Sequence, residues 1–333
     1  MISSINIKKY KCFQDFEIKG LGQINLISGK NNVGKTALLE VFFLIDEDLF
    51  GFFSENAEKK AVIASNRNID EKQYINYLRK FNYFIGYYYA SHKRENSFEV
   101  KRKPSLNTKE LKEIAKLNGD YDEFICEYAN KKMSISPLKK TKMGYVDLIP
   151  SSYINSSKPS NKTLVELYSK IQTKSIQHKF LEYLQKLDDN IKWLEPQLIN
   201  DELVLRVNLK NPEMSLTSSE LGEGVNRYIQ ILATILSSGD SVFIDEIENG
   251  LHYSKLVDIA KAIIEISIAE NKQLFITTHD KDTIEAFSSA CEMLEFEGFR
   301  SIELYKDEQQ NLKSVVRTTK QFIATVGTGI EVR

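Results

Sequence analysis

The sequence predicts an α/β fold with a mostly parallel central sheet, and two observations carry this prediction. The last third of the 333 residues alternates short apolar runs with stretches of helical periodicity. Near the N-terminus, the residues 24–27 (INLI), three of which are apolar, run directly into a glycine-bearing loop and then into a helical pattern. Strands that alternate with helices in this way form a mostly parallel sheet with helices on both faces.

The N-terminal elements are three short strands and one helix. We expect strands around residues 5–7, 16–18 and 24–27, where apolar side chains alternate or run together. The following helix, from Lys35 to about Leu49, is apolar on nearly every side. Such a helix is typical of a position between a sheet and another layer rather than one that faces water.

Residues 50–161 differ in character and are expected to form a mixed insertion of helix and strands. Tyrosine, lysine and glutamate are frequent in this segment. We expect a helix at 69–81 and strands at 97–101, 123–128, 133–136 and 145–149. The stretch 149–162 is rich in serine, proline and asparagine and indicates the best internal boundary of the chain.

The C-terminal elements return to regular alternation. The expected helices cover residues 163–187, 224–236, 254–269 and 281–290, and the expected strands cover 203–207, 241–244, 273–277, 301–306 and 312–317. Residues 1–49 and 200–333 are therefore expected to form one core. Residues 162–199 would add a helical lobe segment to it.

Composition excludes several classes of protein. The chain is 42% hydrophobic and 27% charged, which is typical of a folded globular protein rather than a disordered or fibrous one. The formal net charge of -1 provides no global basic excess for nucleic acid or a membrane surface. The three cysteines, Cys12, Cys126 and Cys291, form no CxxC pair for a metal or redox centre. No apolar run is long enough for a signal peptide or a membrane span, so we expect a cytoplasmic protein without a membrane partner.

Residues 29–36, GKNNVGKT, fit the phosphate-loop pattern GxxxxGK[ST]. Backbone N–H groups of such a loop and the N-terminus of the next helix bind phosphate. Lys35 would contact the β- and γ-phosphates, and the Thr36 hydroxyl would bind Mg²⁺. A chance glycine-rich turn is the alternative, and the flanking strand and helix argue against it. The expected nucleotide contacts are Gly29, Asn31, Asn32, Val33, Gly34, Lys35 and Thr36.

Two further apolar strands end in polar side chains that suit nucleotide hydrolysis. The strand 241–244 is followed by Asp245 and Glu246, of which Asp245 would hold Mg²⁺ and Glu246 would activate the attacking water. The strand 273–277 leads to His279, which would contact the γ-phosphate or the bound water. An ordinary acidic turn and a structural histidine are the alternatives.

Residues 218–227, SSELGEGVNR, form a glycine-containing loop at the start of an apolar helix. The helix N-terminus and the loop N–H groups would make a second anion site at Gly222, Glu223 and Gly224. One nucleotide cannot use both anion sites of a single subunit, so the expected ligand is ATP bound to another copy of the chain. A plain helix cap is the alternative.

The order of these motifs resembles that of the ABC-type ATPase head. More narrowly, the stretches GKNNVGKTALLE, LGEGVNR, FIDEIENGLHYSKL and TTHD resemble the OLD-type (overcoming lysogenization defect) ATP-binding proteins, relatives of the SMC and double-strand-break-repair ATPases. The resemblance covers residues 1–45 and 200–333 well and the middle poorly. By this resemblance Lys35 and Thr36 match Walker A, Asp245 and Glu246 match Walker B, His279 is the switch histidine, and residues 248–252 are the D-loop.

The resemblance implies a P-loop ATPase that uses ATP and Mg²⁺ and works as a homodimer or higher homo-oligomer. Two motifs depart from the family pattern. Residues 222–224 stand where the signature has Ser-Gly-Gly, so that only Ser218 or Ser219 approximates the serine, and a serine of 150–152 or Asn155 would replace the Q-loop glutamine. The middle segment lacks the sustained heptads of SMC arms. There is no room for a TOPRIM nuclease domain, so a nuclease or other effector is expected to be a separate chain, as in two-component antiphage systems.

Two rival functions remain at this stage. An ATP-gated switch with negligible turnover differs from an ATPase only in its rate of ATP hydrolysis. A transporter nucleotide-binding subunit is disfavoured by the altered signature and the large insertion. The basic clusters 101–103 and 139–142 suit either DNA contact or ordinary solvated surface.

Overall fold

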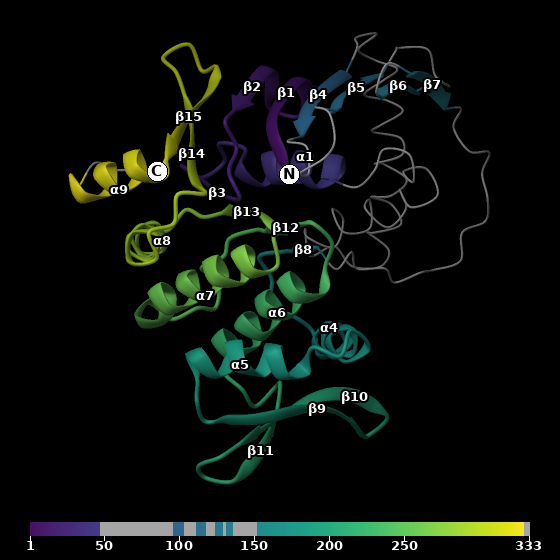
Figure 1. Ribbon diagram of the computed structural model, residues 1–333, viewed down its shortest axis with the longest axis vertical. Helices are drawn as coiled ribbons and strands as arrows, with labels where there is room; N and C mark the ends of the chain where they lie inside the picture. Colours follow the sequence, from purple (N-terminus) through teal and green to yellow (C-terminus); the bar gives the residue numbers. More distant parts are fainter. Residues whose placement is uncertain (47–95, 103–110, 118–123, 129–130, 136–151, 330–333) are drawn as a thin grey trace. The chain divides into compact units, whose positions relative to one another are not determined.

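A computed structural model of the protein describes residues 1–46, 96–102, 111–117, 124–128, 131–135 and 152–329 (Figure 1). The chain divides into two compact units. Unit 1 comprises residues 1–22, 29–150 and 302–316, and unit 2 comprises residues 23–28, 151–301 and 317–333.

Unit 1 contains an antiparallel sheet that begins with the hairpin of β1 (Ile2–Tyr10) and β2 (Phe13–Lys19). Strand β4 (Asn96–Arg102) pairs with the other edge of β1, and the sheet continues in the order β2-β1-β4-β5-β6-β7. The remaining strands are β5 (Leu111–Leu117), β6 (Phe124–Tyr128) and β7 (Lys131–Ile135). The predicted strands 97–101, 123–128 and 133–136 are confirmed where the structure describes them, and residues 123 and 136 lie outside the described residues. Strand β5 was not predicted. The predicted helix 69–81 and strand 145–149 lie outside the described residues.

Four parallel strands form the centre of unit 2. Strand β3 (Ile24–Gly29) pairs with β13 (Gln273–Thr277), β13 with β12 (Ser241–Ile244), and β12 with the short β8 (Tyr153–Ile154). Every residue of β3, β12 and β13 is buried, as expected for a sheet covered on both faces. The sheet order is completed by β14 (Phe299–Lys306) and β15 (Leu312–Thr318). The predicted α/β class with a mostly parallel sheet is confirmed.

The helices follow the predicted pattern with three differences. The described helices are α1 (Lys35–Asp46), α4 (Asn161–Thr173), α5 (Gln177–Leu187), α6 (Glu223–Ser237), α7 (Leu256–Ala269), α8 (Lys281–Met293) and α9 (Thr319–Gly327). The single helix predicted at 163–187 is wrong, because Ser175 is left-handed (φ +56°) and ends α4. The helix predicted to begin at 254 starts as the 3₁₀ turn Tyr253–Lys255, and α9 was missed.

A second antiparallel sheet in unit 2 has the order β11-β10-β9. Its strands are β9 (Ile191–Ile199), β10 (Glu202–Leu209) and β11 (Met214–Thr217). In Figure 1, α5 lies between α6 and the β9–β10 hairpin. The hydroxyl of Tyr168 on α4 donates a hydrogen bond to the Leu194 carbonyl at 2.7 Å, which ties this sheet to the helices. No helix among the described residues has the length and apolar character that crossing a membrane requires.

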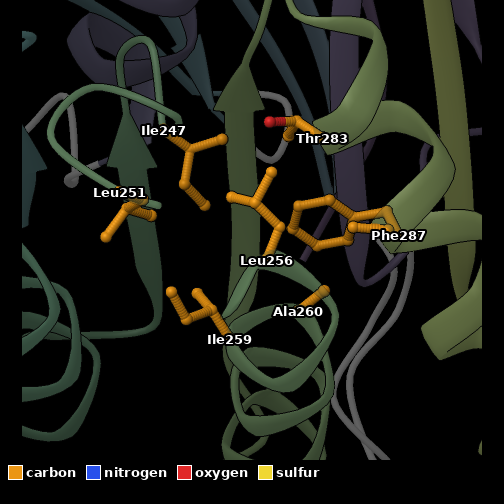
Figure 2. A pocket seen from close by; sticks show the side chains of 8 residues that line it. Ile247, Leu251, Leu256, Ile259, Ala260, Thr283 and Phe287 are labelled. Carbon is orange, nitrogen blue, oxygen red and sulfur yellow. The ribbon is translucent and has the colours of Figure 1, made fainter. Parts of the chain in front are cut away.

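The interior of unit 2 leaves a cavity of about 10 Å³ beneath the turn that follows β12 (Figure 2). Its lining is almost entirely apolar, and the volume is at the lower limit for one water molecule. It is therefore a packing gap rather than a ligand site. The lining side chains are Ile247, Leu251, Leu256, Ile259, Ala260, Thr283, Ala286 and Phe287.

Phe287→Ala is expected to destabilise unit 2 strongly. The ring is 2% exposed and stacks on Phe299 with ring centroids 5.8 Å apart, so its removal enlarges an existing cavity. The expected cost is about 3–5 kcal/mol in the free energy of unfolding, measured by urea titration. Met293→Ala on the same helix is the control, because Met293 is 64% exposed. A loss below about 1 kcal/mol for Phe287→Ala would contradict the packing described.

Candidate functional site

The phosphate loop in unit 1 has the backbone that its sequence requires. Gly29 (φ +146°) and Gly34 (φ +105°) both adopt conformations that side-chain-bearing residues rarely reach. A Cβ at Gly29 would lie 2.5 Å from the Leu304 carbonyl oxygen, and one at Gly34 would lie 2.7 Å from the Cys12 sulfur. Both glycines are therefore required by close packing within unit 1 as well as by the turn.

The side chains of the loop divide into an inner and an outer set. Asn31, Asn32 and Thr36 are exposed, whereas Val33 is buried. Lys35 is 8% exposed, and its Nζ donates hydrogen bonds to the carbonyls of Gly29 at 2.7 Å and of residue 30 at 3.0 Å. The ammonium thus lies inside the curve of the loop, where a bound phosphate would be cradled by backbone N–H groups.

Helix α1, which begins at Lys35, is anchored by a buried carboxylate. Glu40 is 1% exposed and forms an ion pair with Lys11, which lies in the β1–β2 turn. An almost fully buried carboxylate is stable only when it is paired. The pair therefore ties the helix after the phosphate loop to the N-terminal hairpin. The sequence analysis did not identify it.

Asp245 in unit 2 follows the buried strand β12 and is held from the neighbouring strand. The Thr277 hydroxyl donates to Asp245 Oδ1 at 2.6 Å and accepts from the Glu246 N–H at 2.8 Å. Asp245 is 5% exposed, so its carboxylate is oriented in a site largely shielded from water. Thr277 thereby fixes both predicted acidic residues, a role that the apolar pattern of its strand gave no reason to assign.

Glu246 occupies a strained backbone position. Its φ of +46° lies in the left-handed region, which is uncommon for residues other than glycine and asparagine. Its Oε2 accepts a hydrogen bond from Asn249 Nδ2 at 2.8 Å. The side chain is 36% exposed, so the carboxylate is both oriented and open to solvent.

His279 is held by Glu248, a residue that the sequence analysis placed only in the D-loop. Its Nδ1 lies 2.9 Å from Glu248 Oε1, and its backbone N–H donates to the same oxygen at 2.9 Å. The Nδ1 lies 4.0 Å from Glu246 Oε1. The structure therefore brings Glu246 and His279 together in unit 2, as their strand-end positions predict.

The signature loop begins helix α6 with Gly222 as its N-cap. Apart from its chain neighbours, no atom of the described residues lies within 4 Å of a Cβ built on Gly222, whereas a Cβ on Gly224 would lie 3.0 Å from the Gly250 carbonyl oxygen. Glu223 is 64% exposed and lies 3.4 Å from Lys158. The loop thus presents an open Gly222 beside an exposed charged pair, with Gly224 packed against the turn at residues 248–252.

Three of the residues expected to replace family residues have other partners, namely Ser218, Ser219 and Asn155. Ser218 is 2% exposed and bonded to Asn161, so it does not stand in for the signature serine. The Ser219 hydroxyl lies 2.9 Å from that of Thr217. Asn155 follows β8 at the edge of the parallel sheet, and its Oδ1 accepts from the Ser157 N–H at 3.1 Å and hydroxyl at 2.7 Å.

Comparison with known proteins gives relatives along most of the chain. Residues 24–284 match the family described as "AAA domain, putative AbiEii toxin, Type IV TA system". A Helicobacter pylori protein named ATP/GTP phosphatase is 22% identical over 340 aligned positions, covering 89% of this chain and 90% of that protein.

Solved structures share the fold at low sequence identity. The SMC head domain of Thermotoga maritima matches with a TM-score of 0.53 at 12% identity, covering 95% of this chain and 98% of that one. An SMC head bound to the C-terminal winged-helix domain of ScpA matches with a TM-score of 0.57 at 13% identity, covering 95% and 97%. The chain has the α/β fold of a P-loop ATPase head, and it belongs to the AAA-domain family that its residues 24–284 match.

Proposed function

We propose that the protein binds and hydrolyses ATP at the carboxyl ends of its parallel strands. The observation that carries this proposal is the adjacency of β3, β13 and β12 in one parallel sheet. Their carboxyl ends lead respectively into the phosphate loop, to His279, and to Asp245 with Glu246. Ligands of open α/β sheets bind at this edge. The Helicobacter relative named ATP/GTP phosphatase and the AAA-domain family support the same activity.

The residues proposed for ATP and Mg²⁺ suit those ligands. Mg²⁺ in such sites takes one or two protein oxygens and completes its coordination with water and phosphate. One hydroxyl, from Thr36, and one carboxylate, from Asp245, would provide that set if both reach the ion. The described residues contain no cluster of three or more ligating side chains. When bound, the ion would neutralise charge on the phosphates. Nucleotide contacts are proposed for Gly29, Asn31, Asn32, Val33, Gly34, Lys35 and Thr36.

The chemical step is proposed for Glu246 and His279. Glu246 is oriented by Asn249 and open to solvent, which suits a base that takes a proton from water. Because Glu248 faces Nδ1 of His279, the opposite ring nitrogen, Nε2, is the one left to contact phosphate or water. The left-handed backbone of Glu246 stores strain of the kind that occurs at active sites.

We further propose that two copies assemble when ATP is bound, with the phosphate loop of one copy facing the signature loop of the other. The open surroundings of Gly222 support this, because backbone N–H groups at a bare helix N-terminus can approach phosphate closely. The backbone N–H groups of Glu223 and Gly224 would contact the same phosphate. A protein that works this way couples ATP binding to assembly.

We propose that the protein is an OLD-type head that regulates a separate effector, such as a nuclease, in antiphage defence or DNA processing. Support comes from two comparisons: the toxin named in the family description, and an SMC head bound to a winged-helix domain of ScpA. DNA is a second proposed ligand, through the basic residues 101–103 and 139–142.

Lys35→Ala tests the nucleotide site directly. Removing the ammonium that lies inside the loop should lower ATP affinity by about tenfold or more, which corresponds to about 1.4 kcal/mol of binding free energy. Binding would be measured by calorimetric titration with ATP and Mg²⁺. Lys19→Ala is the control, because Lys19 is 69% exposed and lies outside the loop. Equal affinity in Lys35→Ala and the wild type would refute the proposed site.

A further inference from the structure

Arg227 is a buried cation with hydrogen bonds to three separate segments of unit 2. It lies in the second turn of α6 and is 2% exposed. Its Nη1 donates to the Asn155 carbonyl at 2.5 Å and to Gln230 Oε1 at 3.1 Å. Its Nη2 donates to the carbonyls of Asp245 at 2.9 Å and Glu246 at 3.3 Å. The guanidinium thus joins the signature helix, the loop after β8 and the turn after β12.

Stability alone does not explain a cation at this position. Desolvation lowers the pKa of Arg227 to about 10, although the nearby Asp245, Glu248 and Glu246 carboxylates favour its charged form. The guanidinium donates to backbone carbonyls and one side-chain amide rather than to a carboxylate, and its buried Nε has no hydrogen-bond partner among the described residues. Apolar residues of similar volume often replace buried ions without loss of stability.

The contacts of Arg227 bear directly on the backbone of Glu246. The Thr277 hydroxyl accepts from the Glu246 N–H, and Arg227 donates to the carbonyls on both sides of that residue. These bonds orient the two peptide groups that give Glu246 its left-handed conformation. A displacement of α6 would move the guanidinium relative to these carbonyls and so would change the direction of the Glu246 carboxylate.

We propose that Arg227 is a positioning residue that couples the signature loop to Glu246. Gly222 caps the helix that carries Arg227, so a phosphate bound at Gly222 would act on Glu246 through one rigid element. This inference rests on the proposed function, because it needs ATP turnover and a signature loop that binds phosphate. The inference names Arg227 as the residue through which phosphate binding at the signature loop would set the orientation of the Glu246 carboxylate.

Arg227→Lys is the first test. Lysine keeps the positive charge, but its compact ammonium cannot replace the planar guanidinium, which donates hydrogen bonds to three segments at once. We expect turnover at saturating ATP to fall by about tenfold or more while ATP affinity stays within about twofold, because the phosphate loop is unchanged. Tyr228→Phe is the matched control, since it removes a hydrogen bond from the next residue of α6 to the Tyr183 carbonyl, 3.1 Å away and remote from Glu246. Tyr228→Phe should keep wild-type turnover.

A double-mutant cycle with Gly222→Asp separates coupling from general loss of structure. If Arg227 transmits the state of the signature loop, the double variant should turn over no more slowly than the slower single variant. If the two substitutions act independently, the fold losses of turnover in the single variants should multiply in the double variant. Melting temperatures of all variants check the fold. If Arg227→Lys does not fold, Gln230→Met, which removes one acceptor of the same fork, should lower turnover severalfold at unchanged affinity.

The outcomes separate this inference from the proposed function. Unchanged turnover in a folded Arg227→Lys or Gln230→Met protein, multiplicative defects in the cycle, or a parallel loss of affinity, melting temperature and turnover would each overturn the role of Arg227. Absence of ATP turnover in the wild type, or normal turnover in Gly222→Asp, would instead refute the proposed function itself and this inference with it.

Discussion

Replacing Glu246 by glutamine should leave ATP binding intact and lower turnover by roughly a hundredfold or more. General-base catalysis contributes about 10²–10⁴ in rate, and glutamine cannot accept a proton from water. Its amide oxygen can still accept the hydrogen bond that Asn249 donates to Glu246, so the turn should keep its shape. Steady-state phosphate release and ATP titration of the same protein would measure both quantities.

Glu285→Gln provides the chemically matched control for this experiment. Glu285 lies on α8 in unit 2, is 49% exposed and pairs with Lys281 on the helix surface. Its change to glutamine should alter neither turnover nor affinity. Normal turnover in Glu246→Gln would remove Glu246 from the chemical step, and a loss of affinity as large as the loss of turnover would indicate a role in binding instead.

The sequence predicted where the central strands end and which polar side chains follow them, because each prediction depends on a short continuous stretch of residues. Strands β3, β12 and β13 are fully buried and mostly apolar, and each is followed within three residues by a polar side chain. Runs of this kind identify a fully buried parallel strand together with its end. The roles assigned to those polar side chains remain proposals.

The supporting contacts could not be predicted because their partners come from distant parts of the chain. Arg227 donates to a carbonyl 72 positions away, and His279 contacts Glu248 across 31 positions. Within the sequence, Arg227 is one polar residue near the start of an amphipathic helix, and Glu248 is one of several acidic residues in a turn. The packing of α6 against β12 and β8 brings Arg227 to its carbonyl partners, and the pairing of β12 with β13 brings Glu248 to His279.

Two differences between prediction and structure in residues 161–199 have local causes: strand β9 was not predicted, and a single helix was predicted in place of α4 and α5. Pro196 lies inside β9, and a proline argues against a central strand, but β9 is an edge strand where the missing N–H is tolerated. The break between α4 and α5 uses Ser175 at the left-handed position where glycine usually stands. The Ile176 N–H still reaches the Ile171 carbonyl at 3.1 Å, as in a glycine-ended helix.

Gly222→Asp should abolish the assembly of two copies that ATP induces. In a Glu246→Gln background, which retains ATP, the wild-type signature loop should shift the protein from monomer to dimer in light scattering. An aspartate at Gly222 would place a carboxylate where phosphate is expected and would repel it. Gly224 is the less informative position, because any side chain there presses on the Gly250 carbonyl 3.0 Å away and disturbs the turn.

Gly239→Asp is the control that separates the position of the added charge from the charge itself. A Cβ added at Gly239, like one added at Gly222, would meet no atom within 4 Å in the part of the chain that the structure describes, chain neighbours aside. Gly239, however, follows the C-terminal end of α6 rather than its N-terminus. The two variants therefore carry the same added charge in equally open surroundings. If only Gly222→Asp prevents the dimer, phosphate contact at the helix N-terminus is required for assembly. If both variants dimerise with ATP, the signature loop does not face the nucleotide of the second copy. If neither variant dimerises, the added charge rather than its position prevents assembly.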